Sequence, residues 1–460
     1  MIPKNIFQTW VSLDFHPAIQ DRINITKELN PDYNHIIYTD EDIENYMNEN
    51  YSGIILECFN RLNIPTAKID FWRYLILYKY GGIYLDMDSS INTPLDSIIG
   101  DEDDAIITAE KCPNTYVQWA LMFDKHHPIL KRAIDIVVEN IKNEFHTDDI
   151  FYLTGPQAFS KAINSIHFEL FGEEIEHNKI DNNTNILYKK NNISYRLYGV
   201  DYNQHLSFKC PEYQFLYKDR KHWRDEIKEV PLLKEKLNVD KVYICHYKKL
   251  TERKKSVLSQ FKEESIYNYE FVESYNKDEW DKDEIEKEYP NIFKHWQTGI
   301  SSYDENSQNS ERSLALKHVS ILKDIYNSGY SSALILEDDV VLCDNFVKYC
   351  NLFMSQLPYD WDIVWVGSCF NLHEPQEEGK YVYKTNRGSR CTHAFMVSKS
   401  MVNKVIDFIS EINTPSDHFY NNLIKDCNLN NYWFEPSLST QSLEYASSLS
   451  GNYWNASIVN

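Results

Sequence analysis

Glycine and proline are scarce in this chain, with 13 Gly and 15 Pro among 460 residues. So low a content argues against long disordered tracts. No apolar run approaches the length needed to cross a bilayer, and the first residues, MIPKNIFQTW, do not resemble a signal peptide. The sequence therefore predicts a soluble globular protein in the cytoplasm.

Positive charge is also in short supply. The chain has 47 Lys and Arg against 69 Asp and Glu, which gives a formal net charge of -22. A protein that binds nucleic-acid phosphates or an anionic membrane needs a basic face. We therefore expect neither as a partner, although a local pocket can still bind a diphosphate.

Familiar cysteine and catalytic motifs are missing as well. Nine cysteines are scattered without any CxxC pair, which favours reduced thiols over a disulfide framework or a zinc site. No Gly-rich phosphate loop, GxSxG elbow or HExxH motif occurs.

The bias toward Asn, Ile, Lys and Tyr is typical of an A/T-rich genome, bacterial or viral.

What the chain does contain is the same pattern of elements in each half. IPTAKIDFWRYLILYKYGG predicts an amphipathic helix that ends at Gly81 and Gly82 and precedes the strand IYLD. SLALKHVSILKDIYNSG predicts a second helix that ends at Gly329 and leads into YSSALILEDDVVL. Both strands end in acidic residues. Because the two sequences are dissimilar, we interpret this as repeated architecture rather than an obvious tandem duplication.

The boundary between the halves is predicted near Leu233, where EVPLLKEKLNVDKVYICHY passes from a charged connector into a new first strand. This gives two domains, residues 1–233 and 234–460, each long enough to bury its own core. Alternating short strands and helices indicate α/β domains with a largely parallel sheet. Ligands of such domains bind outside the carboxyl ends of the strands.

Asp86 and Asp88 follow the first of these strands, although like charges repel one another. Residues i and i+2 of a strand point to the same side, so both carboxylates can face one point. A hard divalent ion such as Mg²⁺ or Mn²⁺ would stabilise them and leave positions free for a diphosphate. The alternative is that they are ordinary turn or cap residues.

Asp70 and Arg73 stand three residues apart on the preceding helix and can share one face. Neither fits the apolar stripe of that helix. The guanidinium can pair with Asp70 or contact a diphosphate. The alternative is an ordinary surface salt bridge.

The blocks IPKNIFQTW, AKIDFWRYLILYKYGGIYLDMD and TGPQAF resemble glycosyltransferase family 32, over about residues 1–230. The resemblance implies a GT-A fold, which is Rossmann-like, together with a nucleotide-sugar donor, a divalent metal and retention of anomeric configuration.

The same resemblance implies roles for individual residues. Asp86 and Asp88 match the metal and diphosphate motif, and Asp70 and Arg73 match contacts to the donor sugar, with a catalytic role. Trp10 falls where the first strand of the family approaches the nucleotide base, the alternative being a core aromatic. YKDRKHWRDE is loosely similar to a terminal segment of the family, which would bring in His222 and Trp223, the alternative being a surface turn.

The second half resembles a different family. VDKVYICHYKKLTERKKSV, LALKHVSILKDI, ALILEDDVVL, WDIVWVG, THAFMVSKSMVNKVI and PSDHFYNNL follow in order the blocks of glycosyltransferase family 25, over about residues 238–445. This resemblance implies a second GT-A domain that inverts configuration. VYICHY departs from the more apolar first strand usual in that family.

Site residues of the second domain are implied in the same way. Glu337, Asp338 and Asp339 match an EDD motif, with Glu337 and Asp339 as metal ligands on one strand face and Asp338 as a donor contact. Arg253 matches a basic residue that meets donor phosphate. His318 matches a family histidine, the alternative being a satisfied helix histidine.

Asp417 matches a late acidic position of the family. An inverting transfer needs a base for the acceptor hydroxyl, and Asp417 is the candidate. The alternative for Asp417 is a metal ligand or a residue that supports one.

Taken together, the sequence predicts two GT-A domains in tandem that form a bifunctional, metal-dependent glycosyltransferase. Mn²⁺ or Mg²⁺ and a nucleotide-sugar, a UDP-sugar or GDP-mannose, are the expected cofactors, and a glycan or glycoprotein is the expected acceptor. One alternative is a metal-dependent phosphohydrolase in which Asp86 is the nucleophile. Another is an inactive glycan-binding scaffold.

Overall fold

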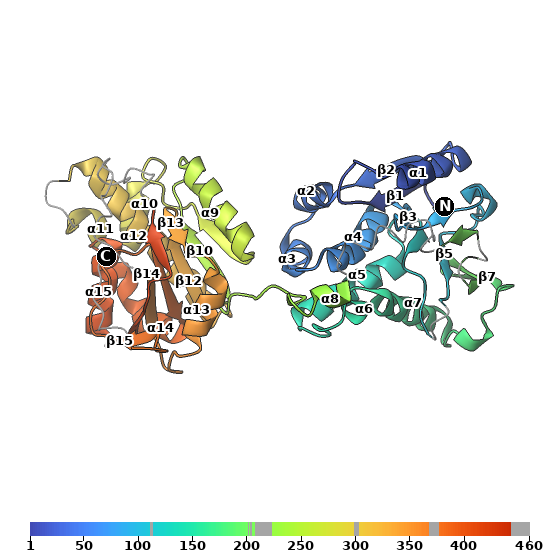
Figure 1. The fold of residues 1–460 in the computed structure, drawn as a ribbon. Coiled ribbons are helices and arrows are strands. Elements are labelled where there is room, and N and C mark those ends of the chain that lie inside the picture. The colour runs from blue at the N-terminus through green and yellow to red at the C-terminus, as the bar shows by residue number, and fades with distance from the viewer. Residues whose placement is uncertain are drawn as a thin grey trace. The chain divides into compact units, whose positions relative to one another are not determined.

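The computed structural model divides into two compact units, Met1–Lys234 and Glu235–Asn460. It describes residues 1–110, 114–200, 202, 205–207, 223–298, 303–367 and 377–442. The division lies one residue beyond the boundary that the sequence suggests. Each unit has its own sheet and its own hydrophobic core, which confirms the α/β fold class (Figure 1).

The first unit is built around one mixed sheet. Its described strands are β1 (Asn5–Thr9), β2 (Asn34–Tyr38), β3 (Gly82–Leu85), β4 (Ser90–Ile91), β5 (Ala105–Thr108), β6 (Ala120–Phe123), β7 (Asn185–Lys190), β8 (Ile193–Tyr198) and β9 (Leu206–Ser207). Seven of them pair in the order β2-β1-β3-β6-β5-β8-β7, and β4 pairs with β9. The pairings β1–β2, β1–β3 and β5–β8 are parallel, and the other three are antiparallel. The sheet is therefore mixed rather than largely parallel.

Helices of the first unit gather mainly on one face of this sheet. They are α1 (Pro17–Leu29), α2 (Asp40–Asn50), α3 (Gly53–Arg61), α4 (Pro65–Tyr80), α5 (Pro128–Lys142), α6 (Ile150–Leu153), α7 (Pro156–Phe171) and α8 (Trp223–Glu226). Because strand side chains alternate, Phe7 and Tyr84 join the core beneath α2 to α7, whereas Ile6 and Ile83 join a smaller cluster on the other face.

Two glycines end α4 and place the next strand. Gly81 has φ 65° and Gly82 has φ 115°, which is backbone that L side chains rarely adopt. A Cβ on Gly81 would lie 2.6 Å from Cδ of Pro3. The predicted glycine stop is confirmed, but the predicted single apolar stripe is too narrow, because α4 also buries Asp70 and Arg73.

The second unit repeats this plan. Its described strands are β10 (Lys241–Cys245), β11 (Tyr269–Val272), β12 (Ser332–Glu337), β13 (Val340–Leu342), β14 (Ile363–Gly367), β15 (Val382–Lys384), β16 (Ala394–Ser398), β17 (Asn431–Phe434) and β18 (Ser439–Gln441). They follow the order β11-β10-β12-β16-β14-β17-β15, with β13 and β18 beside this path. β10–β11, β10–β12 and β14–β17 are parallel, whereas β12–β16, β14–β16 and β15–β17 are antiparallel.

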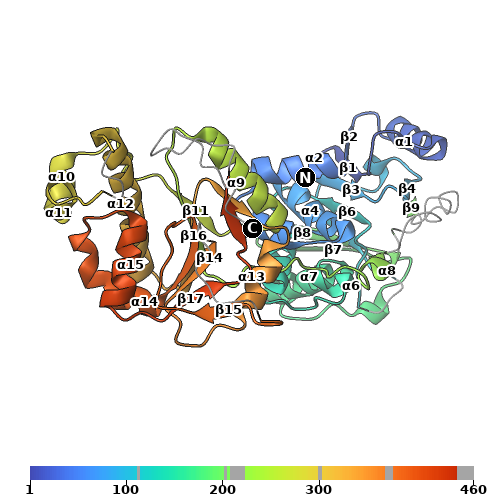
Figure 2. The same ribbon diagram turned by 60° about the vertical axis from the view of Figure 1, so that its left-hand side comes forward.

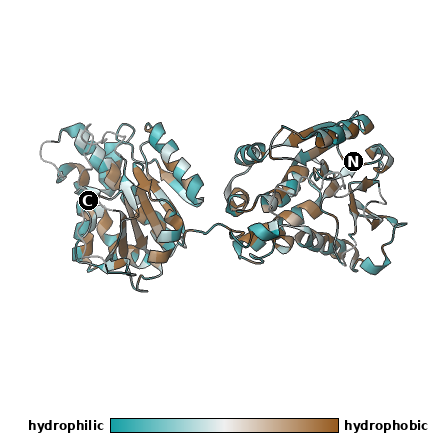
Figure 3. Cartoon of the chain, in the orientation of Figure 1, coloured by the Kyte–Doolittle hydropathy of each residue, from teal (hydrophilic) through white to brown (hydrophobic). Residues whose placement is uncertain are grey.

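Helices cover both faces of the second sheet. They are α9 (Thr251–Glu264), α10 (Lys282–Glu288), α11 (Asn291–Lys294), α12 (Glu305–Asn327), α13 (Phe346–Met354), α14 (Lys399–Val405) and α15 (Ser416–Asp426). α12, α14 and α15 lie side by side on one face (Figure 2), and α9 and α13 pack on the other. Hydrophobic residues gather on the strands of both units, between more hydrophilic helix surfaces (Figure 3).

The two sheets have the same order of strand directions. From β2 to β7, and from β11 to β15, successive pairings run parallel, parallel, antiparallel, antiparallel, parallel and antiparallel. β3 and β12 occupy the same place in this order, and each precedes an acidic turn. The repeated architecture predicted from the sequence thus extends to whole sheets.

None of the described helices combines the length and hydrophobicity needed to cross a bilayer.

Cys391 is disulfide-bonded, and its partner is not among the five described free cysteines. The expectation of uniformly reduced cysteines is therefore wrong at Cys391, because sequence spacing does not reveal which distant thiols meet.

Candidate functional site

Asp86 and Asp88 lie in a turn just beyond β3. The backbone N–H of Asp86 still donates to the carbonyl of Trp119 at 2.8 Å, and the N–H of Ser89 closes the turn onto the Asp86 carbonyl at 3.0 Å. The prediction that both aspartates share a strand face is therefore wrong, because the strand ends at Leu85. The turn still leaves both carboxylates partly exposed, at the carboxyl end of a central strand.

Arg73 of α4 forms an ion pair with Asp86 of this turn. Its Nη2 lies 3.3 Å from Oδ1 of Asp86 and 3.0 Å from Oδ1 of Asp70, and its Nη1 donates to the Gln118 carbonyl at 2.9 Å. The guanidinium also stands over the ring of Tyr84, 4.4 Å from its centroid. The Asp70 and Arg73 side chains are each only 6% exposed, which rules out the surface salt bridge.

Burial controls the charge of the two aspartates that face Arg73. It raises the pKa of Asp86 to about 6, with Arg73 opposing the rise and Asp88 adding to it. It also raises the pKa of Asp70 to about 6, against the effects of Arg73 and of the Thr154 hydroxyl. Asp86 keeps 27% of its side chain exposed, so a ligand can reach it, whereas Asp70 is enclosed.

Trp10 lies beside the turn and is neither fully buried nor fully exposed. It follows β1, and its N–H donates to the carbonyl of Tyr38 at 3.0 Å. Its side chain packs with Ile19, Ile23 and Met87, and Met87 is the residue between the two aspartates. The structure therefore brings Trp10, Asp70, Arg73, Asp86 and Asp88 together.

Three site residues of this unit escaped the sequence reasoning. The Tyr84 hydroxyl donates to Oδ1 of Asp86 at 2.8 Å, and the Thr154 hydroxyl donates to Oδ2 of Asp70 at 3.2 Å. Gln118 contributes the carbonyl that accepts from Arg73. In the sequence, nothing distinguishes Tyr84 from other tyrosines of predicted strands. The contact of Gln118 is made by its backbone carbonyl, which every residue has, so the residue type does not reveal it. Only Thr154, within the TGPQAF block, carried a hint.

The segment that contains His222 and Trp223 adds no residue to the described site. His222 lies outside the described residues. Trp223 begins α8 and packs against the core beneath α2 to α7, with Arg224 over its ring.

Glu337 is the last residue of β12 in the second unit. Its N–H donates to the His393 carbonyl at 3.0 Å, and its Oε1 accepts from the Thr392 hydroxyl at 2.5 Å. Burial raises the pKa of Glu337 to about 8, and the nearby Asp339 raises it further while Thr392 opposes the rise. The Thr392 hydroxyl in turn lies 2.8 Å from the Ser416 hydroxyl.

Asp338 is fully engaged by protein groups. Its Oδ1 lies 2.8 Å from Nη1 of Arg253, and its Oδ2 lies 2.8 Å from Nδ1 of His246 and accepts from the Tyr247 N–H at 3.3 Å. Asp338 is 6% exposed. It therefore positions Arg253 and His246, a role that the sequence did not suggest.

Asp339 also contacts Arg253, but one of its carboxylate oxygens can still accept a ligand. Its Oδ2 lies 3.4 Å from Nη1 of Arg253. Its Oδ1 is buried and accepts no hydrogen bond from any described group. Burial raises the pKa of Asp339 to about 6, with Arg253 opposing the rise. Arg253 thus forms ion pairs with the acidic turn of the second unit, as Arg73 does with the acidic turn of the first unit.

Asp417 stands at the start of α15, next to Ser416. The hydroxyls of Ser416 and Thr392 connect this helix end to Glu337, and the charge of Asp417 is close enough to raise the pKa of Glu337. Asp417 keeps 21% of its side chain exposed. The structure therefore groups Asp417 with the acidic turn and leaves its carboxylate reachable.

His318 lies apart from these groups, on the face of α12 that packs into the core. It is completely buried, with its ring stacked on Phe395 at 5.7 Å and edge-on to Tyr420 at 5.6 Å. Neither ring nitrogen has a hydrogen-bond partner among the described residues. His318 therefore cannot touch a donor in this conformation, and it is not a satisfied helix histidine either.

A divalent metal fits two carboxylate pairs. No set of three or more His, Cys, Asp or Glu side chains in the described part of the chain is arranged to hold a metal by itself. Mg²⁺ in phosphate-handling sites takes one or two carboxylates and completes its shell with phosphate oxygens and water. Asp86 with Asp88, and Glu337 with Asp339 and its unpartnered Oδ1, meet that requirement.

Comparisons with known families match both units. Residues 18–105 match the family described as "Glycosyltransferase sugar-binding region containing DXD motif". Residues 239–420 match "Glycosyltransferase family 25 (LPS biosynthesis protein)". The predicted resemblance of each half to a glycosyltransferase family is thereby confirmed, and both acidic turns fall within the matched segments.

Curated relatives include several mannosyltransferases. Inositol phosphoceramide mannosyltransferase 1 of Schizosaccharomyces pombe is 32% identical over 136 residues, which cover 29% of this chain and 42% of that protein. The initiation-specific alpha-1,6-mannosyltransferase of Candida albicans is 25% identical over 200 residues, covering 35% of this chain and 52% of that protein. The chain spans about half the length of these relatives.

Among solved structures, "PaToxG Glycosyltransferase" aligns with 37% of this chain and 72% of that chain, at 20% sequence identity and a TM-score of 0.31. An alignment this loose does not bear on the site.

Proposed function

We propose that this chain, with one region similar to DXD glycosyltransferases and one similar to family 25, is a glycosyltransferase with an active site in each unit. It would transfer sugars from nucleotide-diphosphate donors to a glycan. The observation that carries the proposal is the pair of acidic turns, each after the equivalent strand of a sheet with the same order and each braced by a buried arginine.

In the first unit, Asp86 and Asp88 would hold a divalent cation against the donor diphosphate, and Trp10 would contact the base. Such a cation, when bound, neutralises charge on the departing diphosphate. Arg73 keeps the Asp86 carboxylate in place, and Asp70 orients Arg73. The geometry supports a positioning role for Asp70, since its carboxylate is enclosed. Retention of configuration is proposed from the family resemblance.

In the second unit, Glu337 and Asp339 would hold the cation, and Asp417 would take the proton of the acceptor hydroxyl in an inverting transfer. The hydroxyls of Thr392 and Ser416 connect the start of α15, which carries Asp417, to Glu337. Arg253 would reach donor phosphate only by sharing its contacts with Asp338 and Asp339.

Mannose is the favoured sugar for the unit with the DXD region, since the relatives are named mannosyltransferases. This moves the proposed donor of that unit from a UDP-sugar toward GDP-mannose, while the second unit keeps a UDP-sugar. A lipid or glycan acceptor is compatible with those names. The cytoplasmic location stays a prediction.

A donor panel tests the proposal. Wild type, Asp86→Asn with Asp88→Asn, and Glu337→Gln with Asp339→Asn are assayed with Mn²⁺ and a series of UDP- and GDP-sugars, scored by released UDP or GDP. Each double variant should lose turnover of a different donor by about 10²-fold or more, because it loses the diphosphate clamp of one site.

Matched surface variants serve as controls for charge removal. Asp101→Asn with Glu102→Gln in the first unit, and Asp283→Asn with Glu284→Gln in the second, should retain both activities. Equal turnover in all variants would contradict the assigned roles. Release of inorganic phosphate without sugar transfer would support the phosphohydrolase, and glycan binding without turnover would support the scaffold.

A further inference from the structure

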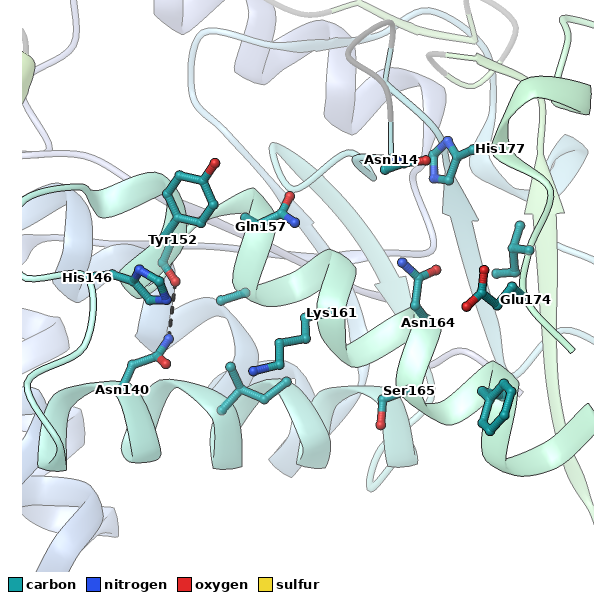
Figure 4. Close-up of a pocket in the computed structure, with 14 residues that line it drawn as sticks. Asn114, Asn140, His146, Tyr152, Gln157, Lys161, Asn164, Ser165, Glu174 and His177 are labelled. Carbon is teal, nitrogen blue, oxygen red and sulfur yellow. Dashed lines mark hydrogen bonds between the residues drawn. The ribbon is translucent and has the colours of Figure 1, made fainter. Parts of the chain in front are cut away.

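A cavity of about 570 Å³ opens in the first unit between α5, α6, α7 and residues 174–177, and we call it the α7 groove (Figure 4). Neither the acidic turn nor Arg73 lines it. The α7 groove is therefore a second concave site in this unit, with a wall of its own.

Polar side chains with hydrogen-bonding capacity to spare line one face of α7. Gln157, Lys161 and Asn164 recur at i, i+4 and i+7, so they follow one another along the groove (Figure 4). Among the described residues, none is hydrogen bonded to the side chains of Gln157 or Lys161. The Oδ1 of Asn164 accepts from the Tyr116 hydroxyl at 3.3 Å, which leaves its amide N–H groups free to donate.

Aromatic side chains flank these amides. Tyr152 is 43% exposed and stacks on His146, with 5.3 Å between ring centroids (Figure 4), and Phe168 is 56% exposed. Tyr152 precedes α7, and Phe168 lies near its end. Exposed rings of this size offer flat apolar surfaces to a ligand.

Charge is balanced among the described residues that line the groove. Lys161 and Glu174 are the only Lys, Arg, Asp or Glu residues among the 14 that line it. Burial lowers the pKa of His177, so this wall residue is neutral near pH 7. A balanced wall favours an uncharged ligand, whereas a phosphate-bearing ligand would favour an excess of basic residues, which the described lining does not have.

We propose that the α7 groove binds a neutral oligosaccharide, laid along α7, as the acceptor of the transfer proposed for the first unit. Hydroxyl groups of such a chain both donate and accept hydrogen bonds, as amide side chains do, and its C–H faces pack on aromatic rings. The 11 helical steps from Gln157 to Phe168 rise about 16 Å, long enough for several sugar rings. This inference rests on the proposed function.

One end of the groove is close in sequence to a residue that supports the acidic turn. Tyr152 stands two residues before Thr154, whose hydroxyl contacts Asp70. Two residues span at most about 7 Å of chain. The end of α6 therefore carries both a residue of the groove wall, Tyr152, and the contact to Asp70 through Thr154.

The test is direct binding of neutral manno-, gluco- and galacto-oligosaccharides of three to five residues to the full chain, without nucleotide, by calorimetry. Gln157→Ala with Asn164→Ala should weaken binding of the best oligosaccharide about tenfold or more, because two hydrogen-bonding groups are lost. Tyr152→Ala should weaken it as well. Asn48→Ala, which removes an exposed amide on α2, should have no effect, and thermal melting checks that each variant is folded.

Each result bears on the proposal. Equal affinity of wild type and the groove variants would overturn it, as would binding only of phosphorylated sugars or no binding of any neutral oligosaccharide. Asp86→Asn with Asp88→Asn should bind the oligosaccharide as wild type does. Wild type that binds the oligosaccharide but turns over none of the donors would refute the proposed function and leave the groove assignment standing.

Discussion

Arg73 holds three acceptors at once within a buried site. It contacts Asp70, Asp86 and the Gln118 carbonyl, and its guanidinium lies over Tyr84. A planar guanidinium can direct its N–H groups to all three, whereas the compact ammonium of lysine cannot span them. The shape of this side chain, beyond its charge, is therefore what the site requires.

We expect Arg73→Lys to destabilise the first unit by about 3–5 kcal/mol, because it leaves buried acceptors incompletely paired. Donor turnover by that unit should fall about 10²-fold. Urea denaturation and the donor assay measure the two effects. Arg132→Lys is the matched control, since Arg132 pairs with the half-exposed Glu169 and should change stability by less than about 1 kcal/mol. Similar losses in both variants would contradict the argument.

His318 makes the stability of the second unit depend on pH. Burial lowers its pKa from 6.5 to about 3, so the folded chain prefers the neutral ring. Its contribution is therefore complete above pH 6.5 and is lost as the pH falls toward 3, by about 1.4 kcal/mol per pH unit.

Replacing His318 with leucine should remove this dependence. Between pH 6.5 and 5.0, wild type should lose about 2 kcal/mol more of its free energy of unfolding than His318→Leu does. At pH 7.5 the variant should be as stable as wild type or more stable, because two unpaired ring nitrogens are removed. Urea titrations at a series of pH values decide this, and parallel pH profiles would refute it.

At the scale of elements, the connection from α4 to β3 sets the place of the first acidic turn. Gly81 and Gly82 let the chain turn within contact of Pro3 and Asn5, so that β3 pairs with β1. Any shift of β3 would move Asp86 relative to Arg73 on the preceding helix. The same residues that end the helix thus position the site.

Gly81→Ala tests this connection. The added Cβ would meet Cδ of Pro3 at 2.6 Å and the Lys125 backbone N at 2.7 Å, in addition to the strain at φ 65°. We expect a loss of more than about 2 kcal/mol in the free energy of unfolding. Gly172→Ala is the control, because Gly172 has φ 77° but open space around it, and the strain alone costs about 1 kcal/mol. Equal losses would show that packing at Gly81 does not matter.

Elements near the sites were predictable where the signal is local. The helix before Gly81, the strand after it and the acidic residues beyond follow from periodicity and turn chemistry within some 20 residues. The pairings of β6 with β3 and of β16 with β12 did not follow, since each joins antiparallel strands that are not neighbours in sequence. Pairing of that kind depends on side-chain packing across the whole sheet.

At the scale of the whole molecule, the first unit extends as far as Lys234. Leu232 and Leu233 are 1% and 8% exposed and join its core, and Leu233 forms a bridge with Leu62. The N–H of Asn63 donates to the Leu232 carbonyl at 2.9 Å. This short segment therefore belongs to the first unit rather than to a free connector.

A fragment of residues 1–234 should accordingly unfold in a single cooperative transition. A fragment of residues 1–229 should be less stable by about 3–6 kcal/mol, because it loses two buried leucine side chains. Thermal and urea denaturation of the two fragments compare them. Fragments of equal stability would mean that residues 230–234 contribute nothing to the core.

The sequence by itself determined two α/β halves, each with a helix, a glycine stop, a buried strand and an acidic end, because periodicity, turn residues and charge are local properties. Only the tertiary structure decided which groups surround those acids. It buried Arg73 with Asp70, occupied Asp338 with Arg253 and His246, connected Ser416, beside Asp417, to Glu337 through two hydroxyls, and enclosed His318. Apart from the Asp70–Arg73 pair, these contacts join residues far apart in the chain, and burial, which sets the charge of all of them, exists only once the chain has folded.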